Sequence, residues 1–473
     1  MAIIIPANSA ADTAYEVANS CRFEDGDTAH FTRTTETPTN VDKYTFSVWV
    51  KRGNLGIANT KLFSIADGTY GEEKLEFNVD DIIWRKTDPD DGCADYERYT
   101  DRKFRDSSAW YHILVAYDSS DGTAGDRMKM YINGVQETSF SGSINPDLNE
   151  NSHVNTASKT LYIGKFKGTG QPFDGYMAEV AFVDGVAHAV TDFGEFDSDS
   201  PTIWKPKDIS SGITWGNNGF WLDFEDSSAL GNDVSGNNND LTAVNLAAAD
   251  QATDTPTNNF CTGNPIYKMG TSTIAEGNCE ISGTSDWQSL ISTFGVSSGK
   301  WYAECKLSSG TNAQIGIVGE TKVNSITTAQ HIGASAGNPN IALHGSGNLY
   351  ENTPGPGSSF SGTYTTGDII GIALDMDNNK LYFSKGGAWA TGSGAWDSTT
   401  FDAAVGNKNL STTGITYFLG SSPNSSTHQW NYGGCPTFAI SSGNADADGY
   451  GNFEYAPPSG YFAICTKNLA EYG

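Results

Sequence analysis

The chain has 473 residues, and 28 basic against 56 acidic side chains give a formal net charge of −28 at pH 7. A chain of this length usually forms more than one domain, and the shortage of lysine and arginine argues against nucleic acid as a partner, because phosphate binding needs a clustered basic surface. No apolar run is long enough to cross a bilayer, so we expect no membrane insertion. With 55 aromatic residues (23 Phe, 21 Tyr and 11 Trp) and 53 glycines, we expect short strands and tight turns rather than disorder.

Residues 1–200 contain a series of short runs in which apolar and polar residues alternate. In KYTFSVWVKRG, for example, Phe46 and Val48 alternate with polar neighbours, and RMKMYINGV ends in Asn133-Gly134, a strong hairpin signal. A period of two residues is typical of strands with one buried face. These runs predict an all-β sandwich.

Residues 201–260 differ from the segments on either side. They begin with several tryptophans and continue as GNDVSGNNNDLTAVNL, which is poor in apolar residues. Alternating runs return from residue 261, among them GKWYAECKLS, AQIGIVGE and TYFLGSS. We therefore expect two β-sandwich domains, residues 1–200 and 261–473, joined by a loop-rich connector over 201–260.

Between about residues 20 and 190 the chain reads CRFEDGDTAHFTRT, YTFSVWVKRG, WYHILVAYD, DRMKMYINGV and then LYIG followed by FDGYMAEVAFVDGVA. These segments resemble, in the same order, the laminin-G-like or concanavalin A-like jelly-roll family. The resemblance implies a two-sheet jelly roll that often binds glycans or proteins and sometimes holds calcium at its rim.

The last part contains SSGKWYAECKL, AQIGIVGE, GDIIGIALDMDNNKLYFSKGG and NFEYAPPSGYFAICTKNL. These segments resemble the SPRY family, which implies a twisted β-sandwich that binds partners through loops and is not an enzyme. The order of laminin-G-like part, connector and SPRY-like part resembles a group of virion proteins of tailed bacteriophages. That resemblance implies a virion surface protein made in the cytoplasm of the host bacterium. Its partners would be other virion proteins or host surface polysaccharide, and it would be a homo-oligomer, with a trimer expected first.

Glycan binding needs aromatic faces that stack on sugar rings and polar groups beside them. The stretch IIWRKTDPDDGCADYERYTDRKF, residues 82–104, is the best candidate, and its arginines could pair with acidic sugars. The alternative is that its aromatic residues belong to the core and its arginines are solvated. The candidate ligand-binding residues are Trp84, Arg85, Tyr96, Arg98 and Tyr99.

Two acidic loops are candidates for calcium, and no other cofactor is expected. DSSDGTAGD lies between two predicted strands, and NADADGYGNFE begins with EF-hand spacing, although its Glu454 comes one residue too early. For both loops the alternative is a solvated polar turn. The candidate ligands are Asp118, Asp121 and Asp126 in the first loop and Asn444, Asp446 and Asp448 in the second.

A third acidic stretch, DMDNN at residues 375–379, lies between two apolar runs. An EF-hand loop starting at Asp375 would need glycine and a carboxylate where Lys380 and Gly386 stand. Because Asp and Asn favour tight turns, this stretch predicts a β-hairpin and not a metal site.

The sequence contains no recognisable catalytic arrangement. It lacks a GxSxG elbow, an HExxH pair and the ExDxxE strand of jelly-roll glycanases, so we expect no catalytic residues and no enzyme. The seven scattered cysteines include no CxxC pair and are expected to be mostly buried thiols. The expected function is a tail fibre, spike or decoration subunit that presents binding modules. Two alternatives stay open: a polysaccharide depolymerase on the jelly roll, and a purely structural capsid decoration or assembly protein.

Overall fold

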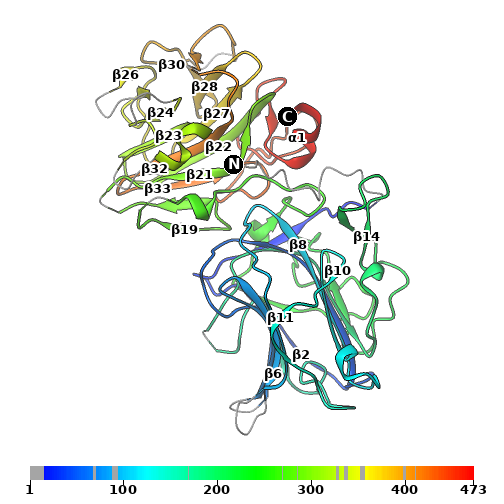
Figure 1. Cartoon of the computed structure of the whole chain (residues 1–473). Coiled ribbons are helices and arrows are strands. Elements are labelled where there is room, and N and C mark those ends of the chain that lie inside the picture. Colours follow the sequence, from blue (N-terminus) through cyan, green and yellow to red (C-terminus); the bar gives the residue numbers. More distant parts are fainter. Residues whose placement is uncertain are drawn as a thin grey trace. The chain divides into compact units, whose positions relative to one another are not determined.

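The computed structural model describes residues 15–67, 71–87, 94–168, 170–268, 270–284, 286–325, 330–334, 339–351, 357–397, 401–410 and 412–473. The described chain is built mainly of strands, and within it the one α-helix is α1 (Thr466–Tyr472). It forms two compact units, one up to Asn258 and one from Asn259 to Gly473 (Figure 1). Each unit is a β-sandwich, so the predicted all-β fold with two sandwiches is confirmed.

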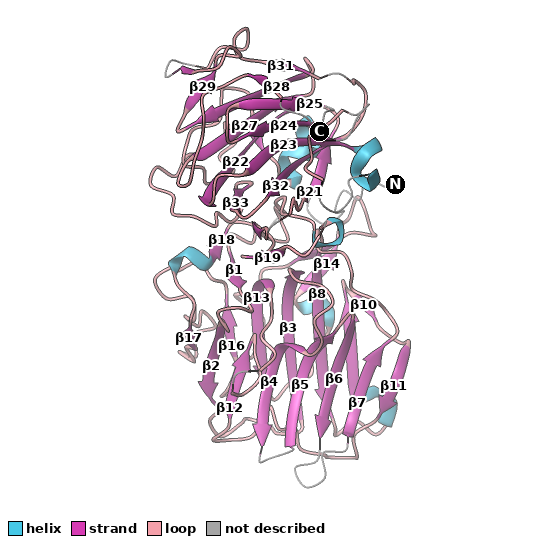
Figure 2. Cartoon of the chain, turned by 90° about the vertical axis from the view of Figure 1, so that its left-hand side faces the viewer, coloured by secondary structure: helices cyan, strands magenta, loops and turns pink. Residues whose placement is uncertain are grey.

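The first sandwich consists of two antiparallel sheets. In order across the first sheet lie β10 (Val135–Gln136), β9 (Met128–Ile132), β8 (Trp110–Asp118), β3 (Lys43–Arg52), β13 (Gly175–Asp184), β1 (Ser20–Phe23) and β18 (Gln251–Ala252), with β16 (Phe220–Leu222) beside β13. Across the second lie β11 (Phe140–Ile144), β7 (Ala94–Thr100), β6 (Asp81–Thr87), β5 (Gly71–Asn78), β4 (Thr60–Asp67), β12 (Thr160–Ile163), β2 (His30–Thr34) and β17 (Thr242–Val244). Figure 2 shows β4, β5, β6 and β7 side by side. A small separate ribbon pairs β14 (Gly194–Phe196) with β15 (Trp204–Pro206).

The second sandwich also has two main sheets. The larger contains β19 (Thr273–Ala275), β20 (Glu280–Ser282), β33 (Thr427–Asn431), β22 (Lys300–Ser309), β27 (Ile369–Asp375), β28 (Lys380–Lys385), β29 (Ala388–Ala390) and β30 (Trp396–Asp397), with β31 (Lys408–Asn409) beside β28 and β34 (Phe462–Ala463) parallel to β22. The smaller contains β21 (Leu290–Val296), β32 (Tyr417–Pro423), β23 (Ala313–Gly319), β24 (Ile341–His344), β25 (Asn348–Glu351) and β26 (Ser358–Ser359).

The first and last segments of the second sandwich are hydrogen-bonded to each other. The amide of Cys261 donates to the carbonyl of Ile464 at 2.9 Å, and the amide of Thr466 donates to the carbonyl of Asn259 at 2.9 Å. The hydroxyl of Thr466 accepts the amide of Asn259 at 3.0 Å. This sandwich is therefore closed where the chain enters and leaves it.

Residues 201–260 do not form the separate connector predicted from their composition. Residues 201–258 belong to the first sandwich, because β16 pairs with β13, β17 with β2 and β18 with β1. These strands are only two or three residues long, too short for a period of two to be visible in the sequence. The division of the chain lies between Asn258 and Asn259.

Both predicted hairpins are confirmed. Asn133 and Gly134 join β9 to β10 with φ angles of 48° and 77°, the left-handed conformation that a type I′ turn requires. In the second sandwich β27 pairs with β28 from Ile370 to Asp375, and Asn379 in the turn has φ of 56°. Asparagine and glycine adopt this conformation at low cost.

Each sandwich encloses its own apolar core. Alternate residues of β3 and β8 point inward, and burying each large apolar side chain contributes roughly 1.5–3 kcal/mol. Six cysteines are buried, as expected, while Cys93 lies outside the described residues. The largest residues of the first core include Tyr44, Phe46, Phe63, Trp84, Tyr96 and Tyr117.

A carboxylate lies inside the first core. Glu73 on β5 is fully buried, and its Oε1 accepts the Tyr44 hydroxyl of the opposite sheet at 2.5 Å. Its Oε2 accepts the Ser152 hydroxyl at 2.9 Å and the amides of His153 and Val154 at 2.7 and 3.0 Å. A buried charge is tolerated only when donors surround it in this way. Glu73 thereby joins both sheets and the loop at residues 152–154.

We expect Glu73→Gln to lower the free energy of unfolding of the first sandwich by about 2–4 kcal/mol. The amide removes the charge and turns an NH2 group toward groups that themselves donate. Urea unfolding followed by tryptophan fluorescence measures the change. Glu72→Gln is the matched control, because Glu72 on the same strand forms an ion pair with Lys74 outside the core, a type of pair worth roughly 0–1 kcal/mol. Equal effects of the two substitutions would contradict this role for Glu73.

Candidate functional site

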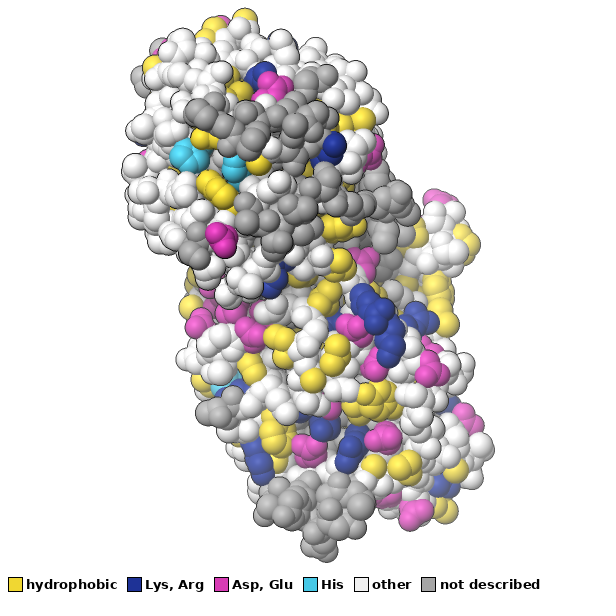
Figure 3. Space-filling model, turned by 60° about the vertical axis from the view of Figure 1, so that its left-hand side comes forward, with side chains coloured by type: hydrophobic (Ala, Val, Ile, Leu, Met, Phe, Trp, Pro, Cys, Tyr) yellow, Lys and Arg dark blue, Asp and Glu magenta, His cyan; other side chains and the backbone are white. Residues whose placement is uncertain are grey.

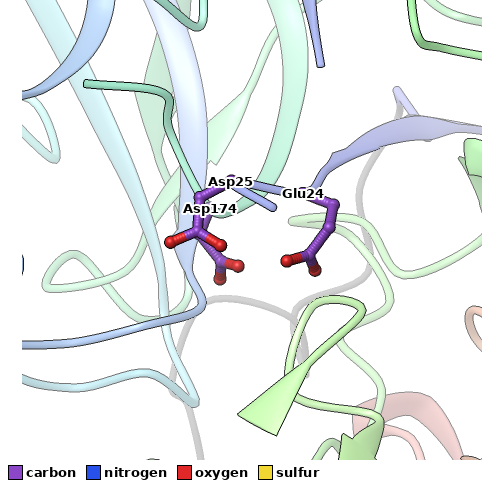
Figure 4. A group of neighbouring side chains, drawn as sticks. All are labelled: Glu24, Asp25 and Asp174. Atoms are coloured by element: carbon purple, nitrogen blue, oxygen red, sulfur yellow. The ribbon is translucent and has the colours of Figure 1, made fainter. Parts of the chain in front are cut away.

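Three carboxylates meet where β1 ends and β13 begins. Glu24 and Asp25 follow β1 directly, and Asp174 precedes β13. The two strands pair antiparallel with Phe23 opposite Gly175, so the acidic residues are brought to the same place. One oxygen of each carboxylate lies within 4.8 Å of the others. Figure 4 shows the three side chains gathered around one space.

The backbone fixes this acidic group from both sides. The turn after β1 is closed by the Ala29 amide, which donates to the Glu24 carbonyl at 3.3 Å. Asp174 is 4% exposed, and its Oδ1 accepts the Asn54 amide at 2.7 Å. Glycine is required at position 53, because a Cβ there would lie 1.6 Å from Asp174 Oδ1.

The chemistry of the acidic group suits a hard cation. Like charges at this distance repel, and either a proton or a cation relieves the repulsion. Arg52 is a neighbouring buried cation whose charge attracts Asp174, while its guanidinium donates to the Phe104 and Val79 carbonyls at 2.5 and 2.7 Å. Calcium takes six to eight oxygen ligands, and three carboxylates can supply up to about six of them. These residues therefore fit calcium, with solvent completing the shell.

The predicted calcium loop of the first domain is wrong. Asp118 Oδ2 accepts Lys43 Nζ at 2.9 Å, and its Oδ1 accepts the Ser120 amide at 3.1 Å. Asp126 instead lies 3.3 Å from Lys129. Asp118, Asp121 and Asp126 do not bring their oxygens together, and within the described residues only the acidic group at Glu24 does so with three or more ligands. Lysines therefore pair with two of the three candidate carboxylates, Asp118 and Asp126.

In the predicted calcium loop of the second domain, the candidate ligands are engaged in hydrogen bonds within the chain. Asp446 Oδ1 accepts the amides of Asp448 and Tyr450 at 3.0 and 2.9 Å, and Oδ2 accepts the Ala463 amide at 2.9 Å. The side-chain amide of Asn444 donates to the Glu454 carbonyl at 2.9 Å. The oxygens of Asp446 thus connect the loop to the chain that precedes α1, and no finding supports calcium at Asn444, Asp446 and Asp448.

The five predicted sugar-binding residues do not share one surface. Trp84 and Tyr96 are fully buried in the core, and Trp84 Nε1 donates to the Tyr44 hydroxyl at 2.9 Å, so neither ring can stack on a ligand. Arg98 also points inward, opposite Trp84 in the ladder, and is 3% exposed. Strand alternation places the half-buried Arg85 and Tyr99 on the other face. The turn at residues 88–93 lies outside the described residues.

Glu179 on β13 is a buried acid that no sequence motif indicates. Glu179 has φ of 51°, and the pairing of β13 with β3 is interrupted there by a bulge. Its carboxyl is bonded to the Tyr15 hydroxyl at 3.2 Å and to Trp221 Nε1 at 2.9 Å. Burial raises the pKa of Glu179 to about 8, so it is largely protonated at neutral pH.

A protonated carboxyl can act as a general acid, but glycoside hydrolysis also needs a second carboxylate and access for the sugar. Glu179 is 6% exposed and is covered by Tyr15 and Trp221. Trp221 in turn stacks on Trp215, with ring planes 8° apart. In this arrangement the carboxyl of Glu179 is shielded from a glycosidic oxygen, and its hydrogen bonds are structural.

Comparisons with known proteins give one sequence match and several structural likenesses. Residues 25–189 match the family model described as the concanavalin A-like lectin/glucanases superfamily. No curated protein matches the chain. Solved structures similar to it include the SPRY domain of human HERC1, with 14% identity and a TM-score of 0.27 over 37% of this chain and 99% of that chain. A native heptameric SAP-like pentraxin from Limulus polyphemus has 14% identity and a TM-score of 0.28 over 38% and 82%. Within the described residues no helix is long and apolar enough to span a membrane.

Calcium is expected to raise the melting temperature of the first sandwich. An ion that binds only the folded state stabilises it by about 2.7 kcal/mol at a concentration of 100 Kd. Asp25→Asn should abolish most of this rise, because it removes one charge from the acidic group. Asp121→Asn, in the loop whose oxygens stay apart, is the control, and differential scanning fluorimetry is the measurement. A calcium effect that is absent, or equally large in both variants, contradicts the site.

The stability of the first sandwich should depend on Glu179 and on pH. The pKa of Glu179 is about 8 in the folded chain against an ordinary 4.5, so its contribution is fully present below pH 4.5 and is lost as pH rises toward 8. A tenfold difference in the acid dissociation constant between folded and unfolded chain corresponds to about 1.4 kcal/mol. Glu179→Gln should therefore lose less stability than the wild type between pH 5 and 8.5. Glu225→Gln, an exposed neighbour, is the control in urea titrations, and a pH-independent difference between wild type and Glu179→Gln would contradict the raised pKa.

Proposed function

We propose that the chain is a non-enzymatic surface protein of a tailed-bacteriophage virion, such as a tail fibre, spike or decoration subunit. Its two β-sandwiches would serve as binding modules for host surface polysaccharide or for other virion proteins. It would be made in the cytoplasm of the host bacterium and assembled as a homo-oligomer, a trimer first. The order of the two modules along the chain supports the virion assignment by resemblance alone.

Carbohydrate is the ligand class with the best support. The concanavalin A-like match covers residues 25–189, and the description of that family names lectins beside glucanases. Lectins and glucanases share this sandwich and differ in whether a carboxylate pair reaches the bound sugar.

The environment of Glu179 is the observation that favours binding over hydrolysis. This carboxyl is kept protonated by burial, as a general acid must be, yet two aromatic side chains cover it. The two carboxylate oxygens of Glu73 likewise accept hydrogen bonds from four donors within the core. These two acids of the first sandwich hold the fold together and leave the recognition of sugars to the surface.

The full chain is expected to bind at least one host surface polysaccharide without cutting it. Immobilised chain is exposed to a panel of bacterial polysaccharides, and bound glycan and released reducing ends are measured in the same wells. Binding without reducing ends supports the proposal. Release of reducing ends means that the chain is a depolymerase. If no glycan binds and labelled protein maps to the capsid shell in electron micrographs, the chain is a structural decoration protein.

A further inference from the structure

The second sandwich contains a cavity of about 470 Å³ beside the hairpin of β27 and β28. Its lining comes from segments far apart in the sequence: the start of β22, the hairpin, the chain at residues 401–404 and the chain just before β34. Figure 2 shows β22, β27 and β28 in one sheet. A volume of this size is typical of small-molecule sites, which range from about 300 to 1,000 Å³.

Three aromatic rings form one side of the cavity. Phe401 packs edge-on against Tyr382, with ring centres 5.0 Å apart, and against Tyr461, with centres 5.5 Å apart. The Tyr382 hydroxyl is already used, because it donates to the Ala403 carbonyl at 2.9 Å. Tyr382 and Tyr461 are buried and Phe401 is half-buried, so Phe401 is the ring of the three that can meet the C–H face of a sugar.

The hydroxyl of Tyr461 is the unusual feature of this cavity. Tyr461 is 3% exposed, and its Oη lies near the Tyr382 hydroxyl and Asp375 but forms no hydrogen bond of good geometry within the described structure. Burial and the nearby charge of Asp375 raise the pKa of Tyr461, so the hydroxyl keeps its proton to donate. Buried polar atoms are rarely left without a well-formed hydrogen bond, and Tyr461 is one of the residues that line the cavity.

The charges of the lining favour an anion. Lys300 Nζ lies 3.4 Å from Asp375 Oδ2, and Asp375 also accepts the amide and the side chain of Asn378, both at 2.9 Å. Lys380 instead donates to the neutral side-chain oxygen of Asn407 at 2.8 Å. Two ammonium groups therefore line the cavity with one carboxylate, in a chain whose net charge is −28. Local positive charge in a concave site attracts negative ligands.

We propose that this cavity binds an acidic sugar, a pyranose ring that carries a carboxylate. The half-buried ring of Phe401 holds the face of the sugar, Lys380 pairs with its carboxylate, and the Tyr461 hydroxyl donates to one of its oxygens. This inference rests on the proposed glycan-binding function and deepens it by naming the ligand class and the place.

The test measures the binding of two monosaccharides to the full chain by isothermal titration calorimetry. D-glucuronate carries the carboxylate, and D-glucose is its neutral counterpart. We expect glucuronate to bind at least tenfold more tightly than glucose. Tyr461→Phe should weaken glucuronate binding at least fivefold without lowering the melting temperature, because the lost hydroxyl forms no hydrogen bond of good geometry in the protein. Lys380→Met should weaken binding at least tenfold, and Lys385→Met, at the other end of β28, is the matched control.

Several results would overturn the inference. Equal affinities for the two sugars would show that the carboxylate does not contribute to binding. Displacement of glucuronate by equimolar inorganic phosphate would show that the cavity binds anions in general. Unchanged binding in both Tyr461→Phe and Lys380→Met would place the sugar elsewhere. If the chain binds a host polysaccharide but not glucuronate, this inference fails and the proposed function stands. If glucuronate binds and no polysaccharide does, the cavity assignment stands without the virion role.

Discussion

The Glu73 carboxylate is enclosed between the two sheets of the first sandwich. It fixes the positions of the side chains and backbone amides that donate hydrogen bonds to it. A charge in an apolar core must be met by donors, and here the donors come from the opposite sheet and from a loop. The Tyr44 hydroxyl also accepts a hydrogen bond from the indole of Trp84, so Trp84 is linked to Glu73 through Tyr44. The aromatic residues of this region are therefore committed to the core, and Trp84 is unavailable for ligand recognition. Figure 3 shows basic and acidic side chains intermingled with hydrophobic and other ones on the face in view.

The strands and hairpins could be predicted because their signals are local. Alternation in β3 and β8 and the turn residues Asn133 and Asn379 act within a few positions of one another. The candidate sites could not be predicted in this way, because a period of two does not tell which face of a strand is buried. Trp84, a candidate for ligand binding, therefore lies in the core instead. Acidic loops look alike in a sequence whether or not a lysine lies opposite them, as Lys43 does for Asp118.

The acidic group could not be predicted for a different reason. Its turns, EDGD and FDGY, are visible in the sequence, but they meet only because β1 pairs with β13 about 150 residues later. The same limit applies to the second sandwich. Residues 375–379 could be recognised as a hairpin turn, but the cavity beside it needs Phe401 and Tyr461, which no local pattern connects to that turn.

The two ends of the second sandwich are held next to each other by hydrogen bonds. Its backbone enters at Asn259 and leaves at Thr466 through neighbouring hydrogen bonds, so its ends lie together. A fold with adjacent ends can be spliced into a foreign loop, or have its old ends joined and new ones opened elsewhere, with little disturbance to its core. The neighbouring ends of this sandwich therefore make its insertion into another chain, or its circular permutation, compatible with an intact core.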